Sequence, residues 1–489
     1  MRADVIARAL RRDGDNAAII TGTDAHENWV LADGLTSGRT PEQTCAHFHS
    51  GITTDLANLG VEFDTWIDPL DPDHAASYAA VHHELLRRMR ATGLARLRQE
   101  RVPFGTNTGR ALVGTWLAGR CPVCSAACGG NTCTGCGAHF QPEEVLNPRS
   151  RLTDEPLEWV SRSHWFVRPE NPTQVVDGLR DRGLPERFLG PVHDYLGRDG
   201  GRIRLSQPGP WGIPTGESAV DSVVSNTYYA YAVYCAQLHA RRDGHHDDNT
   251  LRKDSDVTVV GLFGTDNSIA GLVAPHVIAA ASGLKPFDHT VVNHMLHYEG
   301  DKLSTSKRHG IWITDLIENT DITTDELRWA LAHLPLDHQI GDITADALCA
   351  SINHLRGWRR DRLRIALLAA DRAVPGSPTL LATAAEVIAA QRHHLTPPTV
   401  DLATATTLTR HWLVDSGTDL ADPAQATAWL RGVAELTTPI MPLLARQILT
   451  ALDPPCCATT EGSGQSRLSS VDLEPVRELD PMLVRAVAP

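Results

Sequence analysis

The chain has 489 residues, of which 42% are hydrophobic and 21% are charged, and its formal net charge is -14 at pH 7. This length suits about two to four domains, each with its own core. The acidic balance argues against a broad surface that coats nucleic acid, although it leaves room for a local basic groove. No stretch approaches the roughly 18 apolar residues that a membrane span needs, so we expect a cytoplasmic protein with no membrane partner.

The first predicted elements are a helix and a short strand. Residues 3–12 place apolar side chains at helical spacing, with arginines late in the helix, where they suit its dipole. Residues 17–21 are predicted to form a strand that ends in Gly22-Thr23-Asp24-Ala25-His26. A carboxylate at a strand end is the right group to hold an ammonium, although Asp24 is also suited to cap a helix.

Four cysteines make the strongest local motif. Cys121 and Cys124 form one C-x2-C pair, and Cys133 and Cys136 form a second after eight intervening residues. Two such pairs provide four thiolates for a closed tetrahedral site, which predicts a structural Zn2+ ion rather than disulfides. Cys128 lies between the pairs at a poorer spacing for a ligand.

Residues 257–310 combine the features of a nucleotide site. An apolar strand (257–263) is followed by a turn that carries Gly264 and Asp266, then by a helix and a second strand (290–292). Asp266 is placed to accept a hydrogen bond from a ribose hydroxyl, because side chains at strand ends converge on the crevice of an open α/β sheet. The loop that follows carries Lys302 and Lys307 and is expected to close over a triphosphate, assisted by the hydroxyls of Ser304, Thr305 and Ser306.

These motifs resemble those of one enzyme family. Residues 302–306 resemble the KMSKS loop of class I aminoacyl-tRNA synthetases, and residues 263–266 resemble the ribose-binding strand end of the methionyl branch. Residues 22–26 resemble the TGTDEHG turn of that branch, in which the aspartate holds the α-ammonium of the amino acid. Glu27 stands where the family usually has glycine, and Thr305 stands where it has the second lysine of the loop. Lys307 is long and flexible enough to replace that lysine.

The family's HIGH motif, which lies between its first strand and a helix resembling residues 3–12, has no counterpart in the chain. Two explanations stay open: the natural protein carries a preceding segment with this strand, or the chain is truncated and catalytically impaired. The first is preferred, because a parallel sheet without its central strand exposes pairing edges.

The resemblance also locates the pocket for the amino acid side chain. Asp221 matches an aspartate that begins the family's pocket helix, whereas three bulky wall positions of the family become Ala219, Asn226 and Gly271. Such a pocket would lose aromatic contacts to a thioether. We therefore expect an amino acid other than methionine, unless insertions shift the alignment at these positions.

The fold class implied is α/β, namely a Rossmann-type parallel sheet with a zinc-knuckle insertion, followed by an all-α bundle. Five segments are expected. The catalytic domain has its first half at 1–100, without the first strand, and its second half at 207–335, and between them lies the insertion at 101–206 with the knuckle at 121–136. An anticodon-binding-like bundle follows at 336–455, and a linker and tail at 456–489. The bundle lacks the family's Asn-x3-Arg reader pair. Five arginines of the bundle either contact phosphates or form a solvated helix face. They are arginines 356, 359, 360, 362 and 364.

The expected function is ATP-dependent activation of an amino acid, with Mg2+, as an aminoacyl adenylate. The expected acceptor is tRNA, and the close alternative is a small molecule, an N-hydroxylated amine in natural-product biosynthesis. A third hypothesis is a non-catalytic protein that kept the fold. A monomer is compatible with all three, and the sequence does not name the amino acid.

Overall fold

The computed structural model describes residues 1–133, 135–216, 222–225, 228–242, 249–303, 309–371, 373–415, 417–453 and 477–487. These residues form two compact units. One contains 1–19, 52–64 and 293–489, and the other contains 20–51 and 65–292. We call them the helical unit and the αβ unit. The five predicted domain boundaries stay predictions, since two units do not distinguish five segments.

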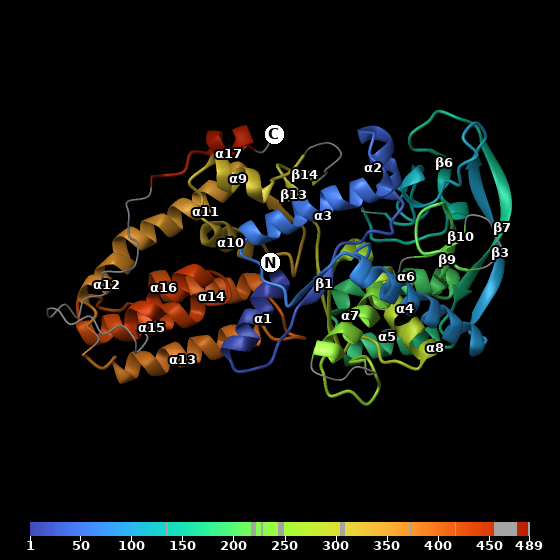
Figure 1. The fold of residues 1–489 in the computed structure, drawn as a ribbon. Helices are drawn as coiled ribbons and strands as arrows, with labels where there is room; N and C mark the ends of the chain where they lie inside the picture. Colours follow the sequence, from blue (N-terminus) through green and yellow to red (C-terminus); the bar gives the residue numbers. More distant parts are fainter. Residues whose placement is uncertain are drawn as a thin grey trace. The chain divides into compact units, whose positions relative to one another are not determined.

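The αβ unit begins with β1 (Ile20–Gly22), which pairs in parallel with β2 (Thr65–Ile67). The other early elements of this part of the chain are α2 (Trp29–Ser37), α3 (Pro41–Asn58, whose last residues belong to the helical unit) and α4 (Pro72–Ala91). Asp71 caps α4 through its side chain and Pro72 opens it, which are both favourable at a helix start. α4 packs against α7 (Tyr228–Arg242) and α8 (Ala274–Ser282) in Figure 1.

A long antiparallel hairpin and a small cysteine-rich sheet form the insertion of this unit. Strand β3 (Ala95–Gly105) pairs along its whole length with β7 (Leu157–Val167), which carries Trp159, Trp165 and Phe166. The cysteine-rich sheet has the order β5-β4-β6, with bounds Ala127–Gly129, Leu117–Arg120 and Leu146–Ser150. The chain then continues through α5 (Pro172–Asp181), α6 (Gly190–Asp199), β8 (Ile203–Arg204), β9 (Ser206–Pro208) and β10 (Ser222–Val224).

The predicted strand, turn, helix and strand of the nucleotide site are all present. They are β11 (Val260–Gly264), a 3-10 turn (Thr265–Asn267), a π-helical turn (Ile269–Val273) that leads into α8, and β12 (His289–Asn293). β11 pairs with β12. The strands of the described residues form six sheets of two or three strands, so the single Rossmann-type sheet stays a prediction, while the mixed α/β class is confirmed.

The helical unit confirms the predicted C-terminal helical region. It contains a small sheet, β14-β13-β15, with bounds Asp301–Lys302, Leu296–Tyr298 and Gly341–Ile343. Figure 1 shows its helices, which are α1 (Arg2–Arg12), α9 (Ile313–Asn319), α10 (Thr324–Ala332), α11 (Ala345–Trp358), α12 (Arg364–Ala369), α13 (Pro378–His393), α14 (Leu402–Asp415), α15 (Pro423–Thr437), α16 (Pro442–Leu452) and α17 (Pro481–Val487).

The N-terminal helix belongs to the core of the helical unit. Val5 and Ala9 of α1 are buried in one apolar cluster with Trp329 of α10 and Trp429 of α15. The buried Arg328 of α10 also bonds to α1. Its Nη2 donates to Asp4 Oδ2 at 2.7 Å. No helix in the described ranges is long and apolar enough to cross a membrane.

Candidate functional site

The turn that carries Asp24 is held from both sides. Thr23 N donates to Ile67 O at 3.1 Å, which extends the β1–β2 pairing by one residue. The Thr23 hydroxyl lies 2.9 Å from His49 Nδ1. Ala25 O accepts a hydrogen bond from Trp211 Nε1 at 2.9 Å. The residues on each side of Asp24 are therefore fixed to other parts of the αβ unit, as an ammonium ligand requires.

The turn that carries Asp266 is fixed by the cysteine-rich insertion. His139 Nε2 lies 3.0 Å from Asp266 O, and because a carbonyl only accepts, the imidazole donates. Burial lowers the pKa of His139 to about 4, so the ring is neutral at pH 7. Ser268 Oγ closes the same turn by donating to Thr265 O at 2.6 Å. The insertion thus supports the predicted ribose site.

The first turn of α7 brings the two strand ends into one region. Burial raises the pKa of Tyr228, and the negative charges of Asp24, Glu27 and Asp266 raise it further. All three carboxylates therefore lie within electrostatic reach of one phenol. A Cβ atom on Gly22 would lie 2.5 Å from the hydroxyl oxygen of Tyr231, so the glycine before Asp24 allows α7 to approach β1 closely.

Glu27 is the departure from the family turn that matters most for the site. Burial raises the pKa of Glu27 to about 8, with a contribution from the negative charge of Asp24. At neutral pH the glutamate is therefore mostly protonated, which leaves Asp24 as the residue of this turn that is expected to bind the ammonium. The substitution is visible in the sequence, but this consequence is not, because it depends on the burial of the turn.

We expect Glu27→Gln to change how stability depends on pH. The folded protein keeps the Glu27 proton up to about pH 8, whereas the unfolded chain releases it near 4.5, so this residue makes stability fall as pH rises between those values. The slope has an upper limit of about 1.4 kcal/mol per pH unit. Hydrogen exchange of β1 and α7, followed during urea titration at pH 5 and at pH 8.5, should therefore show that the stability of the variant relative to the wild type is higher at pH 8.5 than at pH 5. The exposed Glu158→Gln variant serves as the control, and an equal difference at both pH values would refute the shift.

A buried cluster of tyrosines and histidines, missed by the sequence analysis, lies behind this turn. Tyr78 of α4 stacks on His26 with ring centroids 5.5 Å apart and meets Tyr231 and Tyr234 of α7 edge-on. Burial lowers the pKa of His26 to about 4. A signal was available, since four of the chain's seven tyrosines, 228, 229, 231 and 234, occur together on one predicted helix.

The predicted side-chain pocket is only partly described. Ala219, Asp221 and Asn226 lie outside the described residues and stay predictions. Gly271 lies in the π-helical turn and does not face an open space, because a Cβ atom there would lie 2.4 Å from the ring of Phe263. The ring of Phe263 therefore occupies the room that a side chain at position 271 would take.

Of the predicted phosphate-binding loop, only Lys302 and Leu303 are described. Lys302 ends β14, where it pairs with His297 of β13, and its side chain is exposed. Ser304, Thr305, Ser306 and Lys307 lie outside the described residues. Their roles, and that of Lys302, stay predictions.

The four predicted metal ligands come together. The Sγ atoms of Cys121, Cys124, Cys133 and Cys136 all lie within 4.8 Å of one another, with 3.8 Å between Cys121 and Cys136 and 3.6 Å between Cys124 and Cys133. A tetrahedral zinc ion with Zn–S bonds of about 2.3 Å places its sulfurs about 3.8 Å apart. Cys128 is not in the group. The donor set therefore fits a structural zinc ion, which would tie the two turns of the insertion together.

We expect one zinc ion per chain, bound by these four cysteines. Cys124→Ser should lower the zinc content of the purified protein severalfold, because an alcohol is a much poorer zinc ligand than a thiolate. Cys128→Ser is the matched control and should keep the wild-type content. Elemental analysis of both variants checks this, and equal zinc loss in the two would mean that Cys128 is also a ligand.

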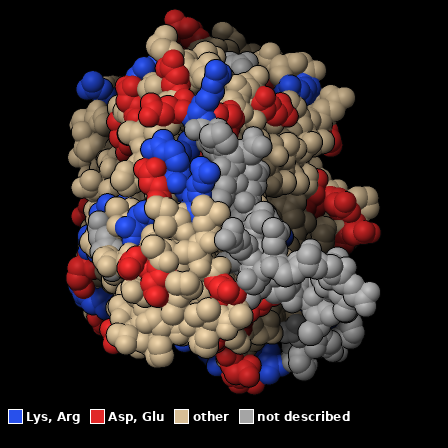
Figure 2. Space-filling model, turned by 90° about the vertical axis from the view of Figure 1, so that its left-hand side faces the viewer, with Lys and Arg blue, Asp and Glu red and all other residues tan. Residues whose placement is uncertain are grey.

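Most of the arginine run at 356–364 is engaged within the helical unit. Arg356 is buried and bonds to both carboxylate oxygens of Glu326, at 2.8 and 3.0 Å. Arg360 pairs with Asp361, and Arg362 lies over the ring of Trp429. On the face drawn in Figure 2, Lys and Arg side chains form small clusters with Asp and Glu close by. Arg356 is therefore structural, whereas Arg360 lies at the surface beside Asp361 and Arg364 is exposed, so the two alternatives for the rest of the run stay open.

Comparison with known proteins identifies the family. Residues 1–355 match the family described as tRNA synthetases class I (M), and the chain belongs to it. It is 25% identical over 345 residues to the methionine–tRNA ligase of Cytophaga hutchinsonii, covering 67% of this chain and 49% of that protein. It is 24% identical over 378 residues to that of Cutibacterium acnes, covering 72% and 61%. The chain thus spans about half the length of the curated relatives it matches.

The fold is also that of solved members. The structure of Mycobacterium tuberculosis methionyl-tRNA synthetase in complex with methionyl-adenylate matches with a TM-score of 0.64 and 19% identity, over 92% of this chain and 89% of that one. Its free state matches with a TM-score of 0.61 and 17% identity. The suspected family is therefore confirmed, as is a mixed α/β fold of the methionyl-tRNA synthetase type with a helical C-terminal region.

Proposed function

We propose that the protein activates an amino acid with ATP and Mg2+ to give an aminoacyl adenylate. The amino acid carboxylate would attack the α-phosphorus of ATP, the bond to the bridging oxygen would break, and pyrophosphate would leave with the metal ion. Asp24 would hold the α-ammonium and Asp266 the ribose. The lysines of the loop, Lys302 and Lys307, would neutralise charge on the phosphates. The observation that supports this most is that the charges of Asp24 and Asp266 both raise the pKa of Tyr228, so both carboxylates lie within electrostatic reach of its phenol.

The protein would contribute chiefly positioning and charge stabilisation, since no covalent enzyme intermediate is needed. The zinc ion would supply structure rather than chemistry, because four thiolates leave no open coordination position.

For the second step we propose transfer to the 3′ end of tRNA, as the names of the relatives suggest. An acceptor hydroxyl would attack the carbonyl carbon of the adenylate and AMP would leave. The second candidate is transfer to a small N-hydroxylated amine. The burial of Arg356 and the contact of Arg362 with Trp429 favour this candidate, because these two side chains are used within the protein and are less available to phosphates.

Amino-acid-dependent exchange between ATP and pyrophosphate tests the first step. It should be measured for all twenty amino acids, on this chain and on a longer form that adds the sequence encoded directly upstream of Met1. Exchange with a restricted set of amino acids is expected, and ATP binding without exchange in either form would support the non-catalytic alternative. Charging of bulk tRNA would then exclude the small-molecule candidate, and transfer only to an N-hydroxylated amine would exclude tRNA.

A further inference from the structure

The second cysteine pair lies directly before the residue that supports the predicted ribose site. Cys133 N donates to Ala138 O, and Gly137 N donates to Cys133 O, both at 2.8 Å. Gly137 has a φ of 73°, a conformation that favours glycine and lets the chain turn sharply after the last cysteine. His139 follows two residues later, so the fold around the cysteine ligands fixes its position.

Two contacts join this segment to the turn that carries Asp266 (Thr265–Asn267), which we call the Asp266 turn. His139 Nε2 donates to Asp266 O at 3.0 Å. A Cβ atom on Gly137 would lie 3.6 Å from Thr265 O, so the backbone of this glycine comes close to the neighbouring carbonyl. Two successive carbonyls of the turn therefore lie against the segment that follows the cysteines.

The bond from His139 has no equivalent elsewhere around the Asp266 turn. The other side-chain bonds of the turn are local. Ser268 Oγ donates to Thr265 O at 2.6 Å, and Asn267 Nδ2 lies 3.4 Å from the Asp266 carboxylate. Among the described residues, no other hydrogen bond joins the turn to a distant part of the chain. Local bonds shape the turn, whereas His139 fixes it to the insertion.

Packing leaves room beside the segment that follows this turn. A cavity of about 100 Å³ is lined by His139 and by Ile269 and Ala270 of the π-helical turn, among others. One water needs roughly 10–15 Å³ of such space, so several waters would fit. An open space offers no packing contacts to the residues that line it. A directional contact such as the bond from His139 therefore matters more here than in a closely packed core.

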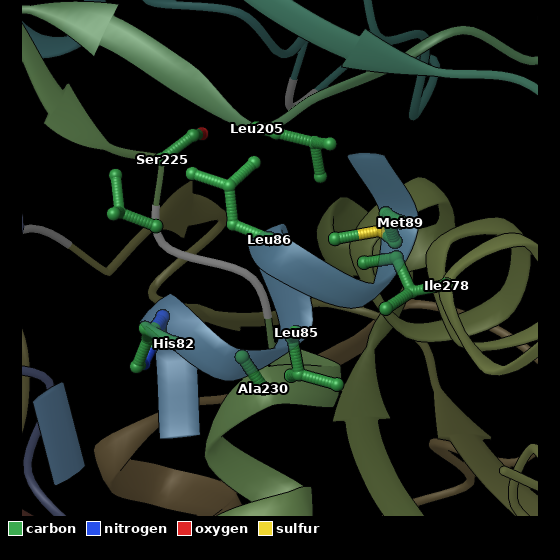
Figure 3. A pocket seen from close by; sticks show the side chains of 9 residues that line it. His82, Leu85, Leu86, Met89, Leu205, Ser225, Ala230 and Ile278 are labelled. Atoms are coloured by element: carbon green, nitrogen blue, oxygen red, sulfur yellow. The ribbon is translucent and has the colours of Figure 1, made fainter. Parts of the chain in front are cut away.

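The far end of α8 is packed more closely. There, Ile278 meets Leu85, Leu86 and Met89 of α4 around a cavity of only about 20 Å³ (Figure 3). This volume suits a single water. Ala274, the first residue of α8, lines the larger cavity instead. The larger free volume thus lies at the start of α8, on the side of the turn.

His139 is itself held by parts of the αβ unit other than the turn that it supports. Arg198 of α6 donates to the His139 carbonyl, and the ring of Tyr195 of α6 meets the imidazole edge-on, with centroids 6.5 Å apart. Phe140, the next residue, is buried in one apolar cluster with Cys133. His139 is therefore a rigid support, as a residue that positions another must be.

The Asp24 turn is held in a different way. Its hydrogen bonds, described above, run to β2, α3 and Trp211, none of which lies in the insertion. The insertion meets the chain again at Asn28, whose Nδ2 donates to Val113 O at 2.8 Å. A change at His139 therefore separates the two turns better than removal of zinc does.

We propose that His139 is a positioning residue that couples the cysteine cluster to the Asp266 turn, so that zinc in this cluster controls the affinity for ATP. This inference rests on the proposed adenylation, in which Asp266 holds the ribose. With the ion bound, the residues before His139 are held in place, and the imidazole in turn holds the Asp266 carbonyl. Loss of the ion or of this bond loosens the turn and weakens ATP binding, while the Asp24 turn keeps its own contacts.

Binding of MgATP in the absence of amino acids, measured by titration calorimetry, is the first test. His139→Leu removes the donor and should weaken binding by up to about tenfold, the effect of one neutral hydrogen bond. His139→Gln keeps an N–H donor and should retain most of the wild-type affinity. His193→Leu, the same change at an exposed position of α6, is the matched control. All three variants should keep the wild-type zinc content, which separates a positioning role from damage to the metal site.

Amide hydrogen exchange tests the same coupling without ATP. In His139→Leu, residues 265–273 should exchange severalfold faster than in the wild type, while residues 20–25 stay unchanged. Removing zinc from the wild type with a chelator should also speed the exchange of residues 265–273. The same treatment of His139→Leu should add little there, because both changes break the same link.

Three results would overturn the inference. They are wild-type MgATP binding by His139→Leu, an equal rise of exchange in both segments of that variant, and an equal effect of zinc removal on residues 265–273 in the two proteins. MgATP binding that depends on His139, without amino-acid-dependent pyrophosphate exchange, would refute the proposed function and leave the coupling standing. A wild type that binds no MgATP would also refute the proposed function, and hydrogen exchange would then decide on the coupling alone.

Discussion

Replacing Asp4 with alanine is expected to lower the stability of the helical unit by about 3–5 kcal/mol, the usual effect of breaking a buried ion pair from one side. Arg328 is fully buried and Asp4 is 1% exposed. The guanidinium donates to Asp4 Oδ2 at 2.7 Å, to Ile440 O at 2.8 Å and to Pro439 O at 2.9 Å. Without Asp4 the arginine would keep its carbonyl partners but lose its buried counter-charge.

Hydrogen exchange of α1 and α10, followed during urea titration, measures this effect locally. The two-unit architecture makes a single global unfolding energy unsuitable. Glu318→Ala, at an exposed position of α9, should change exchange by less than about 0.5 kcal/mol. Adding Arg328→Met to Asp4→Ala should recover part of the loss, because it removes the unpaired charge. A loss in Asp4→Ala no larger than that of the control would contradict this account.

The ion pair between Asp4 and Arg328 could not be predicted from the sequence, although the helix that carries Asp4 could. The helix at residues 3–12 was predicted from its periodicity and confirmed as α1, since that signal is local. Its partner is not local, because Asp4 and Arg328 are 324 residues apart. An acidic residue in the first turn of a helix needs no partner to be favourable, so nothing in the sequence marked Asp4 as buried.

In the candidate site, too, local features were predictable from the sequence and long-range contacts were not. The cysteine cluster and the strand-turn pattern at Asp266 were predictable, because short spacings and strand ends fix them. The support that His139 gives to Asp266 was not, since it joins an insertion to a turn 127 residues away. The same holds for Gly271, which stands where the family has a bulky wall residue. The ring of Phe263 covers it instead, and the open space lies next to Ala270.

Asp24→Asn is expected to reduce kcat/KM for amino acid activation by about 10²- to 10³-fold, mainly through KM for the amino acid. The amide is isosteric but uncharged, and losing one partner of a partly buried charge pair typically costs 2–5 kcal/mol. Asp266→Asn should instead raise KM for ATP, since this residue is proposed to bind the ribose. Asp73→Asn, at an exposed position of α4, is the matched control.

The α-ammonium itself can be removed to test the pairing. With the carboxylic acid that lacks the α-amino group, the wild type should be as poor as Asp24→Asn, and the two losses should not add, because both changes delete the same interaction. Measuring pyrophosphate exchange for both proteins with both substrates gives the four rates that show whether the two losses are independent. If the two losses multiply, Asp24 acts elsewhere than on the ammonium.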